Sequence, residues 1–417
     1  MIDWHPRQTP DPASPPLAGV RVLDLSRILA GPWATMTLAD LGADVIKVER
    51  PGTGDDTRGW GPPWVEGGDG RREASYFHCA NRNKRAVAID LGSADGAAKV
   101  RRLAAGADVV VENFPLRAGA PDRMGGPARP VHSLAKHGLD PASLRAAHPS
   151  LIVCSITGYG HTGPRATEAG YDAMIQGMSG HMSVTGEPDG PPLKIGVALM
   201  DVLTGLYATN AIQAALLRRD RLARGEGARG EGAHDGGAGP GEHIDLALFD
   251  VAVQCLANQA TGALASGRDP GRLGTAHPSI VPYQGFACAD GHVMLAVGND
   301  AQHARLCELL GRPDLAAPPC HENVGRVEHR DTLVPALAER IAAWKRDAFL
   351  AACAARAIPA GPINTVLQAL ADPQAIARGL ALDLGGAPGI RSPFRFKEAG
   401  DVEPRQSPTL PSTHQAI

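Results

Sequence analysis

The chain has 417 residues, of which 43% are hydrophobic and 4% aromatic, and its formal net charge is −3. This length predicts two domains, or one domain with a large insertion, and the near-neutral charge argues against nucleic acid or an anionic membrane surface as a partner. Because no apolar run approaches the roughly 20 residues that span a bilayer, and the first residues lack the apolar segment of a signal peptide, we expect a cytoplasmic protein.

The first half of the chain alternates short apolar segments with helical ones. The apolar segments are rich in Val and Ile and lack strict alternation, which is typical of parallel strands buried on both faces. This order predicts an α/β fold with a Rossmann-like, doubly wound large domain that binds ligands at the carboxyl ends of its parallel strands. We predict strands at 20–25, 43–48, 86–89, 108–112 and 151–156, with helices at 32–41, 94–105 and 140–147.

The second half begins with helical segments at 171–179 and 201–218, the latter with Asp201 as a candidate N-cap. Residues 220–241 contain a tandem Ala-Arg-Gly-Glu-Gly repeat and indicate a flexible linker or insertion. Strands at 243–246 and 292–297, a helical segment at 333–356, a turn at 359–362 and a helix-free end rich in proline follow. We therefore predict a large domain over 1–219, a linker over 220–241, a smaller α+β domain over 242–340, and a return segment over 341–417 that completes the large domain.

Cysteine and histidine patterns give no sign of a metal or a disulfide framework. The seven cysteines include no CxxC pair, and the 15 histidines include no HExxH motif. We expect reduced, mostly buried thiols and no metal site.

The first strand and turn, which end at Gly31, resemble a dinucleotide site in spacing, because Glu49 follows about 20 residues later. The turn lacks the GxGxxG pattern that lets a backbone approach a pyrophosphate, so the sequence argues against NAD or FAD. Basic residues recur near the strand ends. They are solvated surface charges or, because separate cations can converge on one anion there, a polyphosphate site.

A glycine-rich turn at 158–163 precedes Asp172. A carboxylate there is a candidate covalent nucleophile, since glycine permits close backbone approach to an electrophilic acyl group. The alternative is a carboxylate that stabilises the start of a helix.

Five ordered motifs, at 17–25, 41–52, 81–85, 111–114 and 155–160, resemble the class III CoA-transferase family, which includes formyl-CoA and carnitine-CoA transferases and α-methylacyl-CoA racemase. The resemblance extends over about residues 17–400. It implies an interlocked homodimer, with an acyl-CoA and small carboxylic acids as partners. It also implies that the coenzyme A thioester is a substrate and that no cofactor is bound permanently.

The resemblance implies that Asp172 attacks the acyl-CoA thioester and forms an aspartyl-acyl anhydride. Arg50 and Lys84 are the residues that we expect to contact phosphate. The full set of residues expected to bind CoA is Leu29, Ala30, Arg50, Asn83, Lys84, Arg85, Asn113, Phe114, Arg123 and Gly158. An insertion near 117–133 separates Arg123 from the family pattern.

The segment 271–284 lacks the polyglycine run of formyl-CoA transferases and looks more like members that use succinyl-CoA and dicarboxylic acids. We expect substrate contacts from Tyr159, His277 and Gln284, with a loop-structuring role as the alternative for His277.

Two alternatives to a transferase remain. Racemases of this family carry a histidine before the aspartate, where this chain has Tyr171, a poor base at neutral pH. Asp201 matches their second aspartate, which an N-cap explains equally well. A non-catalytic CoA-binding protein is the other alternative, and retention of Asp172 argues against it.

Overall fold

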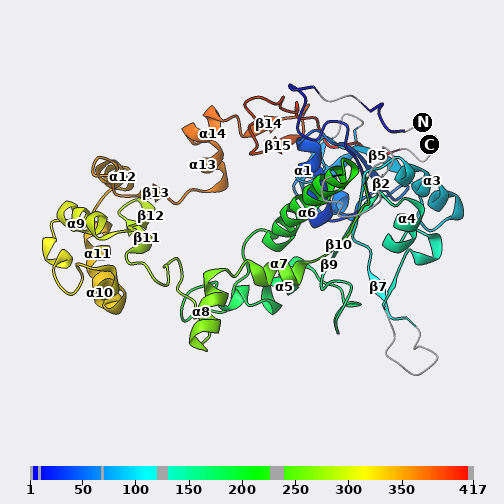
Figure 1. Cartoon of the computed structure of the whole chain (residues 1–417). Coiled ribbons are helices and arrows are strands. Elements are labelled where there is room, and N and C mark those ends of the chain that lie inside the picture. Colours follow the sequence, from blue (N-terminus) through cyan, green and yellow to red (C-terminus); the bar gives the residue numbers. More distant parts are fainter. Residues whose placement is uncertain (1–2, 8–10, 67–69, 120–129, 226–238, 412–417) are drawn as a thin grey trace. The chain divides into compact units, whose positions relative to one another are not determined.

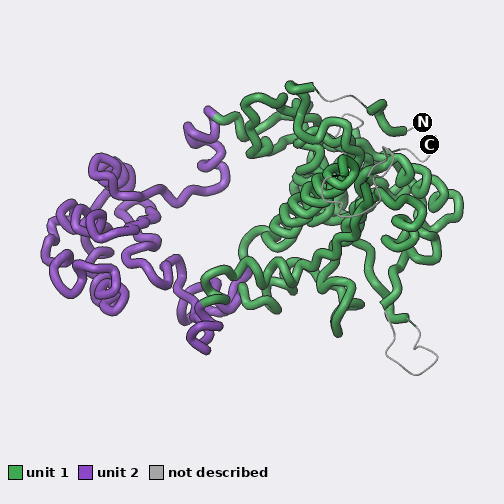
Figure 2. The backbone as a smooth tube through the Cα atoms, in the orientation of Figure 1, with its two compact units in different colours: residues 1–181, 195–261, 378–417 green, residues 182–194, 262–377 purple. Residues whose placement is uncertain are grey.

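The computed structural model describes residues 3–7, 11–66, 70–119, 130–225 and 239–411 (Figure 1). The chain divides into two compact units (Figure 2). Unit 1 comprises 1–181, 195–261 and 378–417, and unit 2 comprises 182–194 and 262–377. Arg123 and most of the tandem repeat lie outside the described residues.

Unit 1 is built on a six-stranded sheet in which every pairing is parallel. The strand order is β10-β9-β6-β1-β2-β5, and the predicted parallel sheet is confirmed. The strands are β1 (Arg21–Asp24), β2 (Asp44–Glu49), β5 (Arg85–Ala88), β6 (Val109–Glu112), β9 (Ile152–Thr157) and β10 (His243–Ala247).

Helices cover both faces of this sheet, so neighbouring residues of one strand enter different cores. Val22 packs with α1 (Ala30–Asp40) and α6 (Leu199–Ala223). Leu23 packs with α3 (Ala94–Ala105) and α4 (Pro141–Ala147). Burial on both faces explains why these strands are continuous apolar runs.

The order of the sheet reverses at β1, which pairs with β2 on one side and β6 on the other. Open α/β sheets bind ligands outside the carboxyl ends of the strands at such a point. The topology therefore predicts a ligand site at the loops that follow β1 and β6.

Three predicted features differ from the structure, besides the helical segment at 333–356, which belongs to unit 2. Strand β10, which we had expected in the small domain, belongs to the large sheet because it pairs with β9. Asp201 is not an N-cap: α6 begins at Leu199, and its N-cap is Ala198, which makes no side-chain capping bond. The expected turn at 359–362 contains β13 (Ala360–Pro362), because this segment adds to an antiparallel sheet.

Unit 2 has a three-stranded antiparallel sheet formed by β11 (Tyr283–Cys288), β12 (Gly291–Ala296) and β13. Apolar residues from this sheet and from the helices around it form a separate core. The expected helix at 333–356 is two helices, α11 and α12. The helices of this core region are α9 (Asp300–Leu309), α10 (Asn323–Glu328), α11 (Arg330–Ala342) and α12 (Arg346–Ala354).

Shorter elements complete both units. The helices are α2 (Ser75–His78), α5 (Asp172–Met178), α7 (Leu248–Gln254), α8 (Asn258–Ser266), α13 (Val366–Leu370) and α14 (Pro373–Ala377). The strand pairs are β3 (Trp64–Glu66) with β4 (Arg72–Ala74), β7 (Leu116–Arg117) with β8 (Val131–His132), and β14 (Ala381–Asp383) with β15 (Pro388–Ile390). Within the described chain, no helix has both the length and the apolar character needed to cross a membrane.

Candidate active site

A cleft of about 270 Å³ opens at the carboxyl ends of the sheet in unit 1. Three loops contribute most of its walls: 27–30 after β1, 113–116 after β6, and 156–158 at the end of β9. Five of the residues expected to bind CoA line this cleft, namely Leu29, Ala30, Asn113, Phe114 and Gly158. The switch point of the sheet thus brings together motifs that are more than 100 residues apart in sequence.

The loop after β1 is held by reciprocal hydrogen bonds with Asn113. The backbone N–H of Arg27 donates to Asn113 Oδ1 at 3.0 Å, and Asn113 Nδ2 donates to the Arg27 carbonyl at 2.8 Å. The next residue, Ile28, has φ of 73°, which is strained for a β-branched residue. The loop therefore carries backbone strain where it borders the cleft.

Asp172 is the first residue of α5 and is only 9% exposed. Its Oδ1 accepts a hydrogen bond from Gln176 Nε2 at 2.6 Å. Its Oδ2 accepts from the backbone N–H of Met200 at 2.8 Å and of Asp201 at 3.3 Å. These donors satisfy a carboxylate that burial would otherwise destabilise, and they fix its orientation.

Gln176 is itself fully buried and held in one orientation. Its Oε1 accepts a hydrogen bond from the backbone N–H of Ile195 at 2.8 Å, so its amide nitrogen must face Asp172. The sequence contained a signal for this contact that we had not used, because residues four apart lie on the same face of a helix.

Two glycines bring the segment before Asp172 against the end of β9. A Cβ atom on Gly158 would lie 2.6 Å from the Cα of Gly170, and one on Gly170 would lie 2.5 Å from the Cα of Gly158. Since backbone atoms cannot yield at such distances, the approach requires glycine on both sides. This contact places Gly170 and Tyr171 in the wall of the cleft, next to Asp172.

A second carboxyl group, that of Asp201, lines the same cleft. Burial, and then the negative charge of Asp172, raise the pKa of Asp201 to about 7. Burial and the charge of Asp201, with smaller effects from Cys79 and Asp172, raise the pKa of Tyr76 to about 12. A carboxyl group that burial and a neighbouring charge tend to keep protonated therefore lines the cleft next to Asp172.

Two arginines, Arg27 and Arg50, lie beside Asp56, which lines the cleft. Arg27, another lining residue, forms an ion pair with Asp56 at 2.8 Å. Arg50 does not line the cleft, but its guanidinium lies 3.9 Å from the other oxygen of Asp56. Both arginine side chains are partly exposed, at 37% and 56%.

We expected Lys84 to contact phosphate, but its side chain is fully buried. Its ammonium donates to Asp24 Oδ2 at 3.0 Å, to the Pro32 carbonyl at 2.9 Å and to Asn81 Oδ1 at 2.9 Å. Burial lowers the pKa of Lys84 to about 8, against the opposing effect of Asp24. This lysine does not line the cleft.

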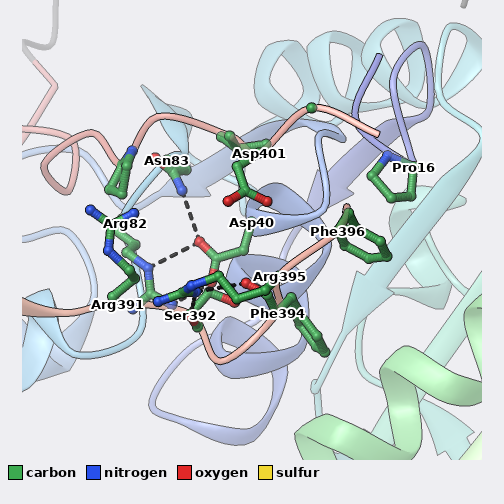
Figure 3. A pocket seen from close by; sticks show the side chains of 13 residues that line it. Pro16, Asp40, Arg82, Asn83, Arg391, Ser392, Phe394, Arg395, Phe396 and Asp401 are labelled. Atoms are coloured by element: carbon green, nitrogen blue, oxygen red, sulfur yellow. Dashed lines mark hydrogen bonds and ion pairs between the residues drawn. The ribbon is translucent and has the colours of Figure 1, made fainter. Parts of the chain in front are cut away.

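Arg85 and Asn83 also lie away from the cleft. Arg85 begins β5 and forms an ion pair at 2.8 Å with Asp44, which begins β2, so this pair sits at the amino ends of the strands. Asn83 donates to Asp40 Oδ1 at 2.8 Å and accepts from the backbone N–H of Arg405 at 2.6 Å. It lines a separate pocket bordered by the C-terminal segment 391–404 (Figure 3).

The three expected substrate contacts are distributed over both units. In unit 1, the Tyr159 hydroxyl donates to Met178 Sδ at 3.0 Å, and the neighbouring Gly160 N–H donates to Thr157 Oγ1 at 2.8 Å. In unit 2, His277 stacks on Tyr283 with ring centroids 5.3 Å apart, and its Nδ1 accepts from the Ser279 N–H at 3.1 Å. These contacts of His277 organise its own loop. Gln284 lies in β11 of unit 2.

Residue 171, immediately before Asp172, is the position at which racemases of this family carry a histidine. Tyr171 lines the cleft and is 60% exposed. The chain thus has a phenol at this position in place of the imidazole that a racemase of this family is expected to use as a base. Among the described residues, no three His, Cys, Asp or Glu side chains gather in a way that could hold a metal ion.

Comparison with known proteins gives concordant matches across the chain. The model of CoA-transferase family III matches residues 17–414. A succinate–glutarate CoA-transferase from Agrobacterium fabrum (strain C58) is 48% identical over 409 residues, covering 96% of this chain and 94% of that protein. A succinyl-CoA:glutarate CoA-transferase from Mus musculus is 40% identical over 395 residues, covering 92% and 82%. The crystal structure of a CAIB/BAIF family protein from Brucella suis has a TM-score of 0.80 at 49% identity, covering 95% and 97%.

Proposed function

Because this chain belongs to CoA-transferase family III, we propose that it moves CoA from succinyl-CoA to a dicarboxylic acid, with glutarate as the first acceptor to test. Relatives that are 48% and 40% identical over most of their length are named for succinate or succinyl-CoA and glutarate. The observation that carries the proposal is the buried, oriented carboxylate of Asp172 beside a cleft at the switch point of the sheet.

The proposed first step is attack by an oxygen of Asp172 on the thioester carbonyl of succinyl-CoA. The C–S bond breaks, CoA leaves as a thiolate, and Asp172 becomes a mixed succinyl anhydride. The thiolate then attacks the aspartyl carbonyl and releases succinate. The acceptor carboxylate attacks this aspartyl thioester, its C–S bond breaks, and a second anhydride forms. The released thiolate attacks the acceptor carbonyl of this anhydride, and its C–O bond to Asp172 breaks. The products are the new acyl-CoA and free Asp172. Each bond that forms is matched by one that breaks, and no step is an oxidation or a reduction.

The hydrogen bonds to Asp172 prepare it for this role. A carboxylate that is already desolvated and aligned needs no reorganisation before attack. Its donors are a side chain and two backbone N–H groups of buried or partly buried residues, so its orientation depends on the fold and not on the substrate.

For CoA, we propose a site in the cleft with Leu29, Ala30, Asn113, Phe114 and Gly158 along its walls. Arg27 and Arg50 are the proposed phosphate contacts. Both guanidinium groups would exchange their contact with Asp56 for a phosphate group of CoA. A phosphate can accept several charge-assisted hydrogen bonds from guanidinium groups.

We also propose, from the family resemblance, an interlocked homodimer in the cytoplasm. Light scattering coupled to size-exclusion chromatography would give the mass of a dimer, and the mass of one chain would contradict this part of the proposal.

The test is an assay with succinyl-CoA and a panel of mono- and dicarboxylic acids, in which mass spectrometry detects new thioesters. We expect glutaryl-CoA from the unmodified protein and none from Asp172→Ala. Asp95→Ala is the matched control, because Asp95 also lies in the first turn of a helix of unit 1 but is 77% exposed. Undiminished transfer by Asp172→Ala would overturn the proposal, and exchange of an α-proton without transfer would favour a racemase.

A further inference from the structure

Asp201 is a carboxyl group in the candidate active site to which the proposed transfer chemistry assigns no task. It lies in the first turn of α6 and lines the cleft. Its backbone N–H donates to Asp172 Oδ2 at 3.3 Å, but among the described residues no group donates a hydrogen bond to its side chain. Since the N-cap of α6 is Ala198, the carboxyl group of Asp201 is not the capping group of that helix.

The surroundings of Asp201 favour its protonated form. Burial and the charge of Asp172 raise its pKa to about 7. The phenol of Tyr76 lies near enough to be affected by its charge. The other titratable groups that line the cleft are Arg27, Asp56, Glu168 and Tyr171.

The charge on Asp172 changes during the proposed reaction, and this change acts on Asp201. While Asp172 is a carboxylate, its negative charge favours the neutral form of its neighbour. When Asp172 becomes an anhydride it is neutral, so that repulsion disappears and Asp201 becomes a stronger acid. The two groups are therefore coupled, and acylation of one promotes release of the proton from the other.

We propose that Asp201 is the general acid and base that exchanges a proton with the sulfur of CoA. This inference rests on the proposed function. As Asp172 attacks, the C–S bond breaks and its electron pair goes to sulfur; the proton of the Asp201 carboxyl group moves to sulfur, giving CoA thiol and an Asp201 carboxylate. Asp201 takes that proton back when sulfur attacks the aspartyl carbonyl and succinate leaves. Asp172 regains its charge only in the last step, when sulfur attacks the acceptor carbonyl of the second anhydride.

The acidities of the two groups suit this exchange. An ordinary thiol has a pKa of about 8.5 and an ordinary aspartate about 3.9. Once Asp172 is acylated, transfer of the proton from Asp201 to sulfur is therefore favourable. The thiol must return this proton to Asp201 before sulfur can attack the aspartyl carbonyl, so one carboxyl group serves both steps as acid and then as base.

The first test is the release of CoA thiol after rapid mixing of the enzyme with succinyl-CoA, measured over a range of pH. Asp201→Asn keeps the size, the backbone N–H and a hydrogen-bond donor, but it cannot give up a proton at these pH values. We expect it to slow thiol release by about 100-fold, the lower range for loss of general acid catalysis. In the unmodified enzyme the rate should fall as pH rises through about 7, because Asp201 loses its proton there, and this decline should vanish in the variant.

Two further measurements distinguish a catalytic role from a merely structural one. Imidazolium buffer should partly restore thiol release in Asp201→Asn, because an external acid can supply the proton. In the unmodified enzyme, which needs no substitution to fold, release in D₂O should be slower than in water. Asp95→Asn is the control for loss of a carboxylate from a first helical turn of unit 1.

The outcomes separate this inference from the proposed function. Release in Asp201→Asn at the unmodified rate, or slower release with an unchanged pH profile and no rescue, would overturn the assignment. If Asp201→Asn does not fold, a pH profile of the unmodified enzyme that is flat around 7, without a solvent isotope effect, would overturn it. Equal transfer by the unmodified enzyme and Asp172→Ala would instead refute the proposed nucleophile.

Discussion

Replacing Gln176 with leucine tests how strongly the orientation of Asp172 controls the reaction. The glutamine is fully buried, donates to Asp172 at 2.6 Å and accepts from Ile195 at 2.8 Å. Leucine has a similar volume but no polar group. The variant therefore removes one charge-assisted hydrogen bond from the carboxylate, and it also removes the hydrogen bond between the Ile195 N–H and the Gln176 side chain.

The expected magnitude follows from those two bonds. A hydrogen bond to a charged group contributes about 1.5–3 kcal/mol, and one between uncharged groups contributes about 0.5–1.5 kcal/mol. We expect the free energy of unfolding to fall by about 2–4.5 kcal/mol, the sum of the two ranges. If the bond to Asp172 is needed to align it for attack, its loss converts to a decrease of about 10-fold to 100-fold in kcat.

Urea unfolding and steady-state transfer from succinyl-CoA to glutarate would measure both effects. Gln254→Leu is the matched control, since Gln254 ends α7 in the same unit and is exposed. A stable, fully active Gln176→Leu enzyme would refute the view that this glutamine holds the nucleophile. Loss of stability with unchanged kcat would assign Gln176 to the fold alone.

Three other substitutions give distinct expected results. Gly170→Ala should lower the thermal unfolding temperature and reduce transfer, because its Cβ would lie 2.5 Å from the Gly158 Cα; unchanged melting and activity would contradict the close approach. Arg27→Ala should raise the KM for succinyl-CoA by roughly 10-fold, in line with loss of one charge-assisted phosphate contact, and this effect should shrink at high salt. Lys84→Met should reduce the stability measured by urea unfolding by about 3 kcal/mol, because it removes one of the two buried ammonium groups, those of Lys84 and Lys47, that neutralise Asp24, and an effect confined to KM would show instead that Lys84 binds CoA.

The large sheet was predictable because buried parallel strands are continuous runs of Val and Ile, as in Val109–Glu112. Strand β10 was predicted as a strand, but its place was not. Local sequence does not record that His243 pairs with Val153, on a strand about 90 residues earlier. The boundary of the small domain was therefore expected before β10, whereas unit 2 resumes at residue 262.

Only some of the expected site residues line the cleft, again because the sequence does not show which distant segments meet. Residues that follow strands, such as Leu29 and Asn113, line the cleft because topology brings the carboxyl ends of parallel strands together. The direction of a long side chain depends on partners elsewhere in the chain. The buried side chain of Lys84 donates to Asp24, and Arg85 forms an ion pair with Asp44 at the amino ends of the strands. Basic character near a strand end therefore did not by itself distinguish Arg27, which lines the cleft, from Lys84 and Arg85, which do not.

Asp201 illustrates how one residue type can have several explanations in a sequence. An aspartate before a helical pattern is typical of an N-cap, but the helix begins two residues earlier and its N-cap is Ala198. What distinguishes Asp201 is its burial beside Asp172, which only the arrangement of α5 and α6 reveals.

The formation of an anhydride on Asp172 is the central claim, and trapping it is the most direct test. The enzyme would be incubated with succinyl-CoA, treated with borohydride, digested and analysed by mass spectrometry. We predict that the peptide with Asp172 carries the alcohol formed by reduction of an activated carboxyl group, and that this product is absent without succinyl-CoA. Continued transfer of CoA with Asp172 unmodified under these conditions would contradict the account.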